Sequence, residues 1–311
     1  MKKVFYGGTV CLIFVLIISN PIIAVSGATN GLLLWFHTII PTLLPFIILS
    51  NLMVSLDIFH YFTFFLAPIT KPLLGISKNS NYAIVLGMLC GYPMGAKTCA
   101  DLVINKKISQ KEGQYLLLFT NNVSPMFIIS YISNSVLKNP DIKGSLLLAS
   151  FSAPILIALI LNKWYRHSIN TDQTIYTQTI IDTKVMDFRL IDKAIMNGFE
   201  TVTKLGGYII LFSIISSFIQ EKLEINLLVK CFILGIVEIT TGIDYIGRMP
   251  FSASLKTLII CGITIFGGLS SLAQTASIVK DAGLSIKSYF LAKLLTGLLG
   301  TFIFYVLYSF T

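Results

Sequence analysis

Long apolar segments recur along the whole chain, and they restrict its fold more than any other feature. Hydrophobic residues make up 55% of the 311 residues and charged residues only 12%, about half the charged share of a soluble domain. So few charges cannot cover a water-soluble enzyme, and so much apolar content excludes a disordered chain. About ten segments could cross a bilayer as helices: 5–25, 38–56, 61–76, 82–98, 114–136, 144–164, 207–220, 228–247, 255–275 and 288–310.

The sequence therefore predicts an all-α polytopic membrane protein. Segments 61–76 and 207–220 are short for a crossing, and each could be a tilted span, a re-entrant hairpin or a buried half-helix. The first segment follows Lys2 and Lys3 and resembles a signal peptide, with a small-residue pattern at 24–26. An uncleaved span is favoured because the apolar stretch is long and more spans follow.

The net charge of +9 comes from 23 basic and 14 acidic residues. Most basic residues lie between apolar segments, which favours membrane topology and anionic lipid over nucleic acid as the explanation. Five cysteines without a CxxC motif and three scattered histidines favour neither a disulfide framework nor a metal site. Catalytic and nucleotide-binding motifs are also missing. We expect no enzyme and no cofactor, and we leave a homo-oligomer open.

The chain contains a weak internal repeat. Residues 91–120 align without gaps onto 267–296, with seven identities in 30 positions. Because equivalent segments are five crossings apart, the halves are expected to run in opposite directions, as in many secondary transporters. Chance similarity between apolar helices is the alternative. The expected organisation is an N-terminal transmembrane segment, a first repeat, a connecting helix with a polar linker, and a second repeat: 1–27, 28–143, 144–194 and 195–311.

The fourth segment is expected to break near Gly91, Pro93 and Gly95. Proline lacks the backbone donor that a helix needs, and glycines let two backbones approach closely. If a half-helix begins here, its free N–H groups can hold an anion, and Lys97 would add full charge. Alternatively, Lys97 extends to the headgroups or pairs with Asp101 one turn on.

Four residues that disfavour a plain helix interrupt the fifth segment: Asn121, Asn122, Ser124 and Pro125. The equivalent stretch of the second repeat, 296–301, also contains breakable positions. Matching interruptions in two repeats indicate a binding site near the bilayer midplane. A proline-kinked packing helix with asparagine contacts is the other interpretation.

Glu238 lies near the middle of an apolar segment and is followed by Thr240 and Thr241. An ionisable group at a helix centre costs roughly 2.5–3.5 kcal/mol on insertion scales, so it marks an interior, a pair or a pathway. The functional interpretation is a coupling-ion or proton site, or a substrate contact. The structural one is a pair with Lys293 or Lys204.

The counterpart of the first break is also rich in glycine and small polar residues, among them Ser270, Ser271 and Gln274. Ala273 replaces Lys97 there, so a role based on charge is confined to the first half. The predicted substrate-binding residues are Gly91, Tyr92, Pro93, Gly95, Lys97, Asn121, Asn122, Ser124, Ser270, Ser271 and Gln274. The predicted coupling-ion or proton residues are Glu238, Thr240 and Thr241.

Three stretches carry a family resemblance: 87–97, 119–127 and 235–242. They are similar to signatures of the sporulation integral membrane proteins of the YlbJ/SpoVV type, which carry a nucleoside-recognition gate domain. The likeness spans roughly residues 28–310. It implies two inverted gate-type repeats, as in concentrative nucleoside transporters.

The resemblance also implies a function. Family members are expected in the outer forespore membrane of sporulating cells, moving dipicolinic acid from the mother cell into the spore. A small dicarboxylate would suit Lys97 and the exposed N–H groups of broken helices. Two alternatives stay open: a nucleoside or nucleobase transporter, and a non-transporting assembly protein of the spore envelope.

Overall fold

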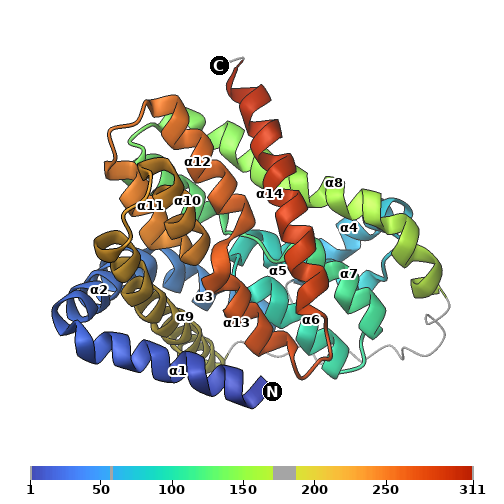
Figure 1. Ribbon diagram of the computed structural model, residues 1–311. Helices are drawn as coiled ribbons and strands as arrows, with labels where there is room; N and C mark the ends of the chain where they lie inside the picture. The colour runs from blue at the N-terminus through green and yellow to red at the C-terminus, as the bar shows by residue number, and fades with distance from the viewer. Residues whose placement is uncertain (1, 57–58, 171–186, 310–311) are drawn as a thin grey trace.

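A computed structural model describes residues 2–56, 59–170 and 187–309. All regular elements in these ranges are helices (Figure 1), which confirms the all-α prediction. Five helical stretches of the described chain are long and apolar enough to cross a membrane: Pro21–Met53, Pro140–Tyr165, Phe188–Lys222, Ala253–Val279 and Ile286–Tyr308. Shorter apolar helices cover Thr63–Leu74, Phe127–Val136 and Leu227–Val237. The count of ten crossings stays a prediction.

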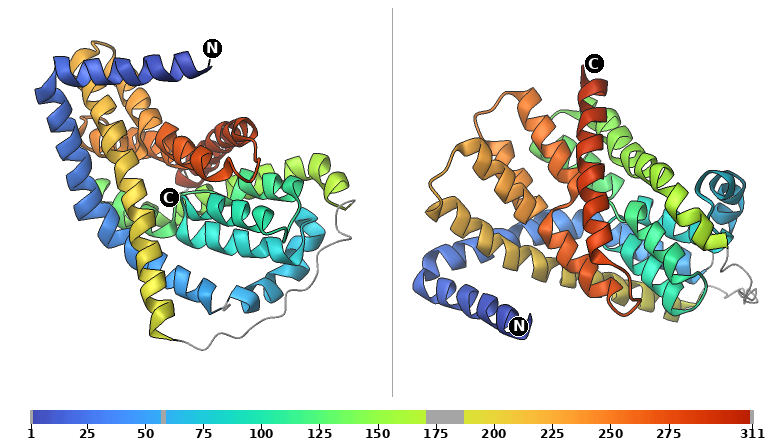
Figure 2. Two further views of the ribbon diagram at one scale, coloured as in Figure 1. Left: turned by 90° about the horizontal axis from the view of Figure 1, so that it is seen from below. Right: turned by 45° about the vertical axis from the view of Figure 1, so that its right-hand side comes forward.

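The N-terminal part departs from the predicted first span, 5–25. Helix α1 (Lys2–Ser19) ends at Asn20, and the chain turns a corner into α2 (Pro21–Leu34) (Figure 2). Pro21 suits the first position of a helix, where no backbone donor is needed, so it starts α2 inside the expected segment. The chain then stays helical through the π-helix η1 (Trp35–Ile39) and α3 (Ile40–Ser55). The first predicted segment, 5–25, is therefore divided between α1 and α2.

Helix α9 (Phe188–Lys222) is one unbroken helix of 35 residues that lies along α2 (Figure 2). Segment 207–220 is its C-terminal part, so it is neither a re-entrant hairpin nor a half-helix. Glycines allow the close approach, since a Cβ on Gly31 would lie 2.8 Å from Ser213 Oγ. The indole of Trp35 donates a hydrogen bond of 2.9 Å to the Val202 carbonyl and fixes η1 on α9.

The first half of the chain continues with short helices. Segment 61–76 corresponds to α4, a 16-residue helix with Pro68 and Pro72 inside. The elements are α4 (Phe59–Leu74), η2 (Lys78–Ser80), α5 (Asn81–Cys90), α6 (Met94–Ile104), α7 (Gln110–Thr120), the π-helix η3 (Phe127–Val136), η4 (Pro140–Ile142) and α8 (Lys143–Asn170).

The second half repeats part of this order. It contains α10 (Leu227–Val237), α11 (Ile239–Arg248), α12 (Ala253–Phe266), α13 (Gly268–Val279) and α14 (Ile286–Tyr308). At the offset of the sequence repeat, Gly91 and Gly267 both lie at a helix break with positive φ. Ser109 and Ser285 both cap the next helix with their hydroxyl groups. The local helix boundaries thus match, whereas the inverted orientation of the halves stays a prediction.

One expected interruption is wrong. The stretch 296–301 lies inside α14, which runs unbroken for 23 residues. This stretch contains no proline, and the hydroxyls of Thr296 and Thr301 donate back to the carbonyls of Ala292 and Gly297, both at 2.7 Å. Such bonds to the carbonyl four residues back can bend a helix but do not interrupt it. The interruption at 121–125 has no counterpart in the second half.

Two glutamines join the start of α7 to the turn before α14. Gln110 donates a hydrogen bond of 2.7 Å to the Gly283 carbonyl, and Gln114 donates one of 3.2 Å to the Ser285 carbonyl. Gln114 also accepts a hydrogen bond from the Ser285 backbone. These bonds, which we call the glutamine clasp, connect two helices that are far apart in the sequence.

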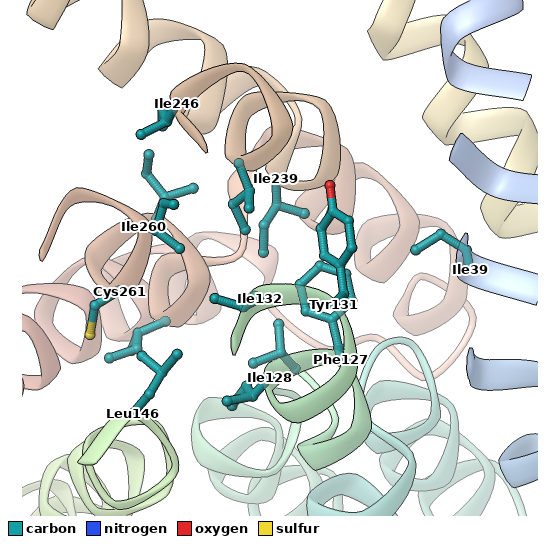
Figure 3. Packing of buried hydrophobic residues seen from close by; sticks show 14 of the residues in the cluster. Ile39, Phe127, Ile128, Tyr131, Ile132, Leu146, Ile239, Ile246, Ile260 and Cys261 are labelled. Atoms are coloured by element: carbon teal, nitrogen blue, oxygen red, sulfur yellow. The ribbon is translucent and has the colours of Figure 1, made fainter. Parts of the chain in front are cut away.

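The main apolar core lies between the halves (Figure 3). It is built from side chains of both, so it holds the helix breaks described below in a fixed relation. Its members include Ile39, Phe127, Ile128, Tyr131, Ile132, Leu146, Ile239, Ile246, Ile260 and Cys261.

Candidate functional site

Four interruptions of helices in the described chain lie near one another in the interior: at 91–93, at 121–124, at Glu238 and at Gly267. A helix end leaves backbone N–H or C=O groups without partners inside the helix. Lipid cannot satisfy such groups, so breaks at membrane depth are tolerated only within protein or beside a water-filled cavity. The four breaks are the natural starting point for a functional site.

The first break needs glycine for steric reasons. Gly91 has φ +72°, and a Cβ there would lie 2.4 Å from the Ser124 backbone nitrogen. A Cβ on Gly95 would lie 2.5 Å from the Thr120 carbonyl oxygen. The backbone around Pro93 therefore packs directly on the end of α7, as the sequence predicts for this motif.

This close contact gives a stability prediction. Gly95→Ala is expected to lower the unfolding temperature in detergent, because overpacking of a tight contact typically costs ~1–3 kcal/mol. Gly207→Ala is the matched control, since nothing lies within 4 Å of the added methyl group. Thermal unfolding of both variants measures the difference. Equal unfolding temperatures for the two variants would refute the contact between Gly95 and Thr120.

Asn121 links three helices. Its side-chain oxygen accepts a hydrogen bond of 3.1 Å from the Ala96 backbone in the first turn of α6. Its amide donates to Thr275 Oγ1 on α13 and to Tyr289 Oη on α14, both at 2.9 Å. Because both amide hydrogens and the oxygen are engaged, this geometry suits a packing role better than a substrate contact.

Asn122 connects the second break to a buried lysine. Its amide donates a hydrogen bond of 2.6 Å to the Phe119 carbonyl, and its oxygen accepts one of 3.1 Å from Lys293 Nζ. Lys293 lies on α14 with 1% of its surface exposed, and its ammonium group lies 5.3 Å from the centre of the Tyr92 ring. From the sequence alone, Lys293 is expected only as a pairing partner of Glu238. The signal that could have found this site was a lysine inside an apolar span.

Glu238 caps α11 and is also 1% exposed. Its Oε2 accepts hydrogen bonds from Thr241, of 2.7 Å from the backbone nitrogen and 3.0 Å from the hydroxyl. The Thr240 carbonyl accepts a hydrogen bond of 2.8 Å from the Tyr131 hydroxyl. An acid at this position has the geometry of a helix N-cap.

The fourth break lies beside Tyr92. A Cβ on Gly267 would lie 2.3 Å from the Tyr92 hydroxyl oxygen, so only glycine leaves room for the tyrosine. Ser271 donates hydrogen bonds to the Gly267 and Gly268 carbonyls at 2.6 and 3.0 Å. These bonds satisfy carbonyls near the break and place the Ser271 side chain next to the tyrosine.

A cavity lies where these breaks meet. About 50 Å³ is available to water-sized molecules, which is room for a few waters. The apolar wall comes from η1, α3 and α9, and the polar groups come from the breaks. The cavity is lined by Ile39, Leu43, Cys90, Tyr92, Val123, Ser124, Phe127, Leu205, Ile209, Glu238, Ile239, Thr240, Ser270, Ser271 and Gln274.

The structure thus brings half of the predicted residues together. Seven line the cavity: Tyr92, Ser124, Glu238, Thr240, Ser270, Ser271 and Gln274. Gly91, Pro93, Gly95 and Thr241 shape the surrounding backbone, whereas Asn121 and Asn122 lie behind the cavity wall. Lys97 is half-buried on α6 and does not line the cavity. Within the described residues, no cluster of three or more metal-binding side chains occurs.

Comparison with known proteins defines the class. Residues 36–138 match the Gate family, described as nucleoside recognition. Together with the apolar helices, this match indicates a multi-pass membrane protein with a region similar to the Gate family. The chain is similar to the sporulation integral membrane protein YlbJ of Bacillus subtilis (strain 168), with 26% identity over 317 aligned positions that cover 90% of this chain and 76% of that protein. The resemblance drawn from the three sequence stretches is confirmed. No solved structure matches the chain.

Proposed function

We propose that this protein is a transporter of a small organic anion, with dipicolinic acid as the candidate substrate. Its proposed place is the outer forespore membrane of a sporulating cell. Transport rather than catalysis is proposed because the polar groups of the interior lie at helix breaks, the usual position of binding sites in secondary transporters. The similarity to a sporulation membrane protein of Bacillus subtilis supports the proposed cellular setting.

The observation that carries the proposal is the cavity at the helix breaks. Polar groups from both halves converge there, including Tyr92 and Ser124 from the first and Glu238 and Gln274 from the second. Ligand sites usually measure ~300–1,000 Å³, so a cavity of about 50 Å³ is too small to hold the proposed substrate without a rearrangement. Passage of substrate would require the apolar wall of η1, α3 and α9 to separate from the breaks.

Uptake into liposomes tests the proposal. Liposomes with the purified protein are expected to take up labelled dipicolinate at least tenfold faster than protein-free liposomes. Unlabelled dipicolinate should compete, and an equal excess of uridine should not. Absence of uptake under every imposed ion or pH gradient would overturn the proposal and favour a non-transporting role in spore-envelope assembly.

A nucleoside transporter is the second candidate, because the matched family is described as nucleoside recognition. Such a substrate needs hydrogen-bond donors and acceptors rather than positive charge, and Ser270, Ser271 and Gln274 could supply them. The same assay separates the two candidates. Labelled uridine entering the liposomes, with dipicolinate failing to compete, would favour the nucleoside.

A further inference from the structure

Lys293 is the least expected charged group in the interior. It lies in the first half of α14, a helix long and apolar enough to span the membrane, and only 1% of its surface is exposed. A charge in that position is costly unless it is compensated. Two ion pairs occur in the described chain, Lys204–Glu200 and Arg248–Asp244, and Lys293 belongs to neither.

The contacts of Lys293 suit a cation without neutralising it. Its Nζ donates to Asn122 Oδ1 at 3.1 Å and lies 5.3 Å from the centre of the Tyr92 ring. An amide oxygen and a ring face both attract an ammonium group, but neither carries a negative charge. The two buried acids of the described chain, Glu112 and Glu238, accept hydrogen bonds from hydroxyls and backbone nitrogens and not from Lys293.

The position of Lys293 connects it to the cavity. Tyr92, whose ring covers the ammonium group, lines the cavity, and so does Ser124, two residues after Asn122. Lys293 itself is not part of the lining. The Tyr92 ring therefore lies between the Lys293 ammonium group and the cavity.

We infer that Lys293 is the cation that binds a carboxylate of the transported anion, once the Tyr92 ring moves aside. This inference rests on the proposed function and assigns the charged contact to Lys293 rather than Lys97. A carboxylate would replace the weaker contact with Asn122 and supply the missing negative charge, forming the charge-assisted hydrogen bond that an ammonium group prefers. The unpaired lysine thus selects an anion over a neutral molecule of the same shape.

The first experiment measures selectivity for charge. Binding of dipicolinate and of its uncharged diamide is compared for the purified wild-type protein, Lys293→Gln and Lys97→Gln. We expect wild type and Lys97→Gln to prefer dipicolinate equally, and Lys293→Gln to lose at least tenfold in dipicolinate affinity with the diamide unchanged. A purely structural lysine would weaken both ligands alike, so equal losses overturn the inference. An unchanged preference in Lys293→Gln overturns it too.

A second variant tests the inference independently, in case Lys293→Gln does not fold. Asn122→Asp places a carboxylate 3.1 Å from the ammonium group, so the lysine is paired within the protein. The substitution also removes the hydrogen bond to the Phe119 carbonyl, so the fold of this variant is checked directly. We expect this variant to elute as the wild type in gel filtration and to lose at least tenfold in dipicolinate affinity. Wild-type affinity in Asn122→Asp would overturn the inference. Failure of the wild-type protein to bind or transport dipicolinate is a separate result, which would overturn the proposed function itself.

Discussion

Glu238→Gln is expected to abolish accumulation of substrate driven by a pH gradient, with a loss of at least tenfold. Glutamine has the same shape, and its amide oxygen can accept the hydrogen bonds that Thr241 donates to Glu238 at 2.7 and 3.0 Å. The cap of α11 should therefore survive, whereas a group able to carry a proton beside the cavity is lost. Proteoliposomes with an imposed pH gradient and labelled dipicolinate measure the effect.

A substrate-exchange assay distinguishes a loss of proton coupling from a loss of substrate binding. In liposomes loaded with unlabelled substrate and no gradient, Glu238→Gln should still exchange labelled for unlabelled dipicolinate. Glu221→Gln, the same change at an exposed position near the end of α9, should leave accumulation and exchange unchanged. If Glu238→Gln accumulates substrate as the wild type does, Glu238 carries no coupling proton.

Asn121→Ala is expected to cause a large loss of stability. The substitution leaves the Ala96 backbone nitrogen without its partner, whereas the hydroxyls of Thr275 and Tyr289 still donate to the backbone carbonyls of Ser271 and of residue 121. A buried polar group left unpaired costs roughly 1–3 kcal/mol, so we expect a loss of about 2 kcal/mol. Chemical or thermal unfolding in detergent measures this loss.

Asn105→Ala provides the control. Asn105 is exposed at the end of α6, and its amide donates one hydrogen bond to the Asp101 carbonyl. Water can replace that bond, so the unfolding temperature should hardly change. A stable Asn121→Ala protein with weakened substrate binding would instead support the substrate contact predicted from sequence for Asn121.

The helix breaks of the first half could be predicted because local chemistry determines them. Gly91, Pro93 and Pro125 disfavour a continuous helix whatever surrounds them. The expected break at 296–301 failed because glycine and threonine interrupt a helix only when tertiary contacts require it. The helix start at Pro21 was missed because it lies inside an apolar segment that extends to residue 25, and Gly27 and Gly31 pack against α9.

The site residues also divide into those that local sequence reveals and those that depend on tertiary packing. Glu238, Ser124 and Ser270 were identified because polar residues in apolar segments are conspicuous, and the structure brings them to one cavity. Lys97 was predicted because it is a charged residue beside a break. It does not line the cavity, because the packing of α6 determines which face of that helix the cavity meets. Lys293 was overlooked as a binding group because its partners, Asn122 and Tyr92, are 171 and 201 positions away in the sequence. Such contacts cannot be read from local patterns.

The glutamine clasp restricts how this protein can change shape. Gln110 and Gln114 hold one end of α7 to the turn before α14, and Asn121 just past the other end of α7 donates to Tyr289 on α14. Because α7 is attached to α14 at both of its ends, we expect the two helices to move together in any rearrangement that exposes the interior to alternate sides of the bilayer.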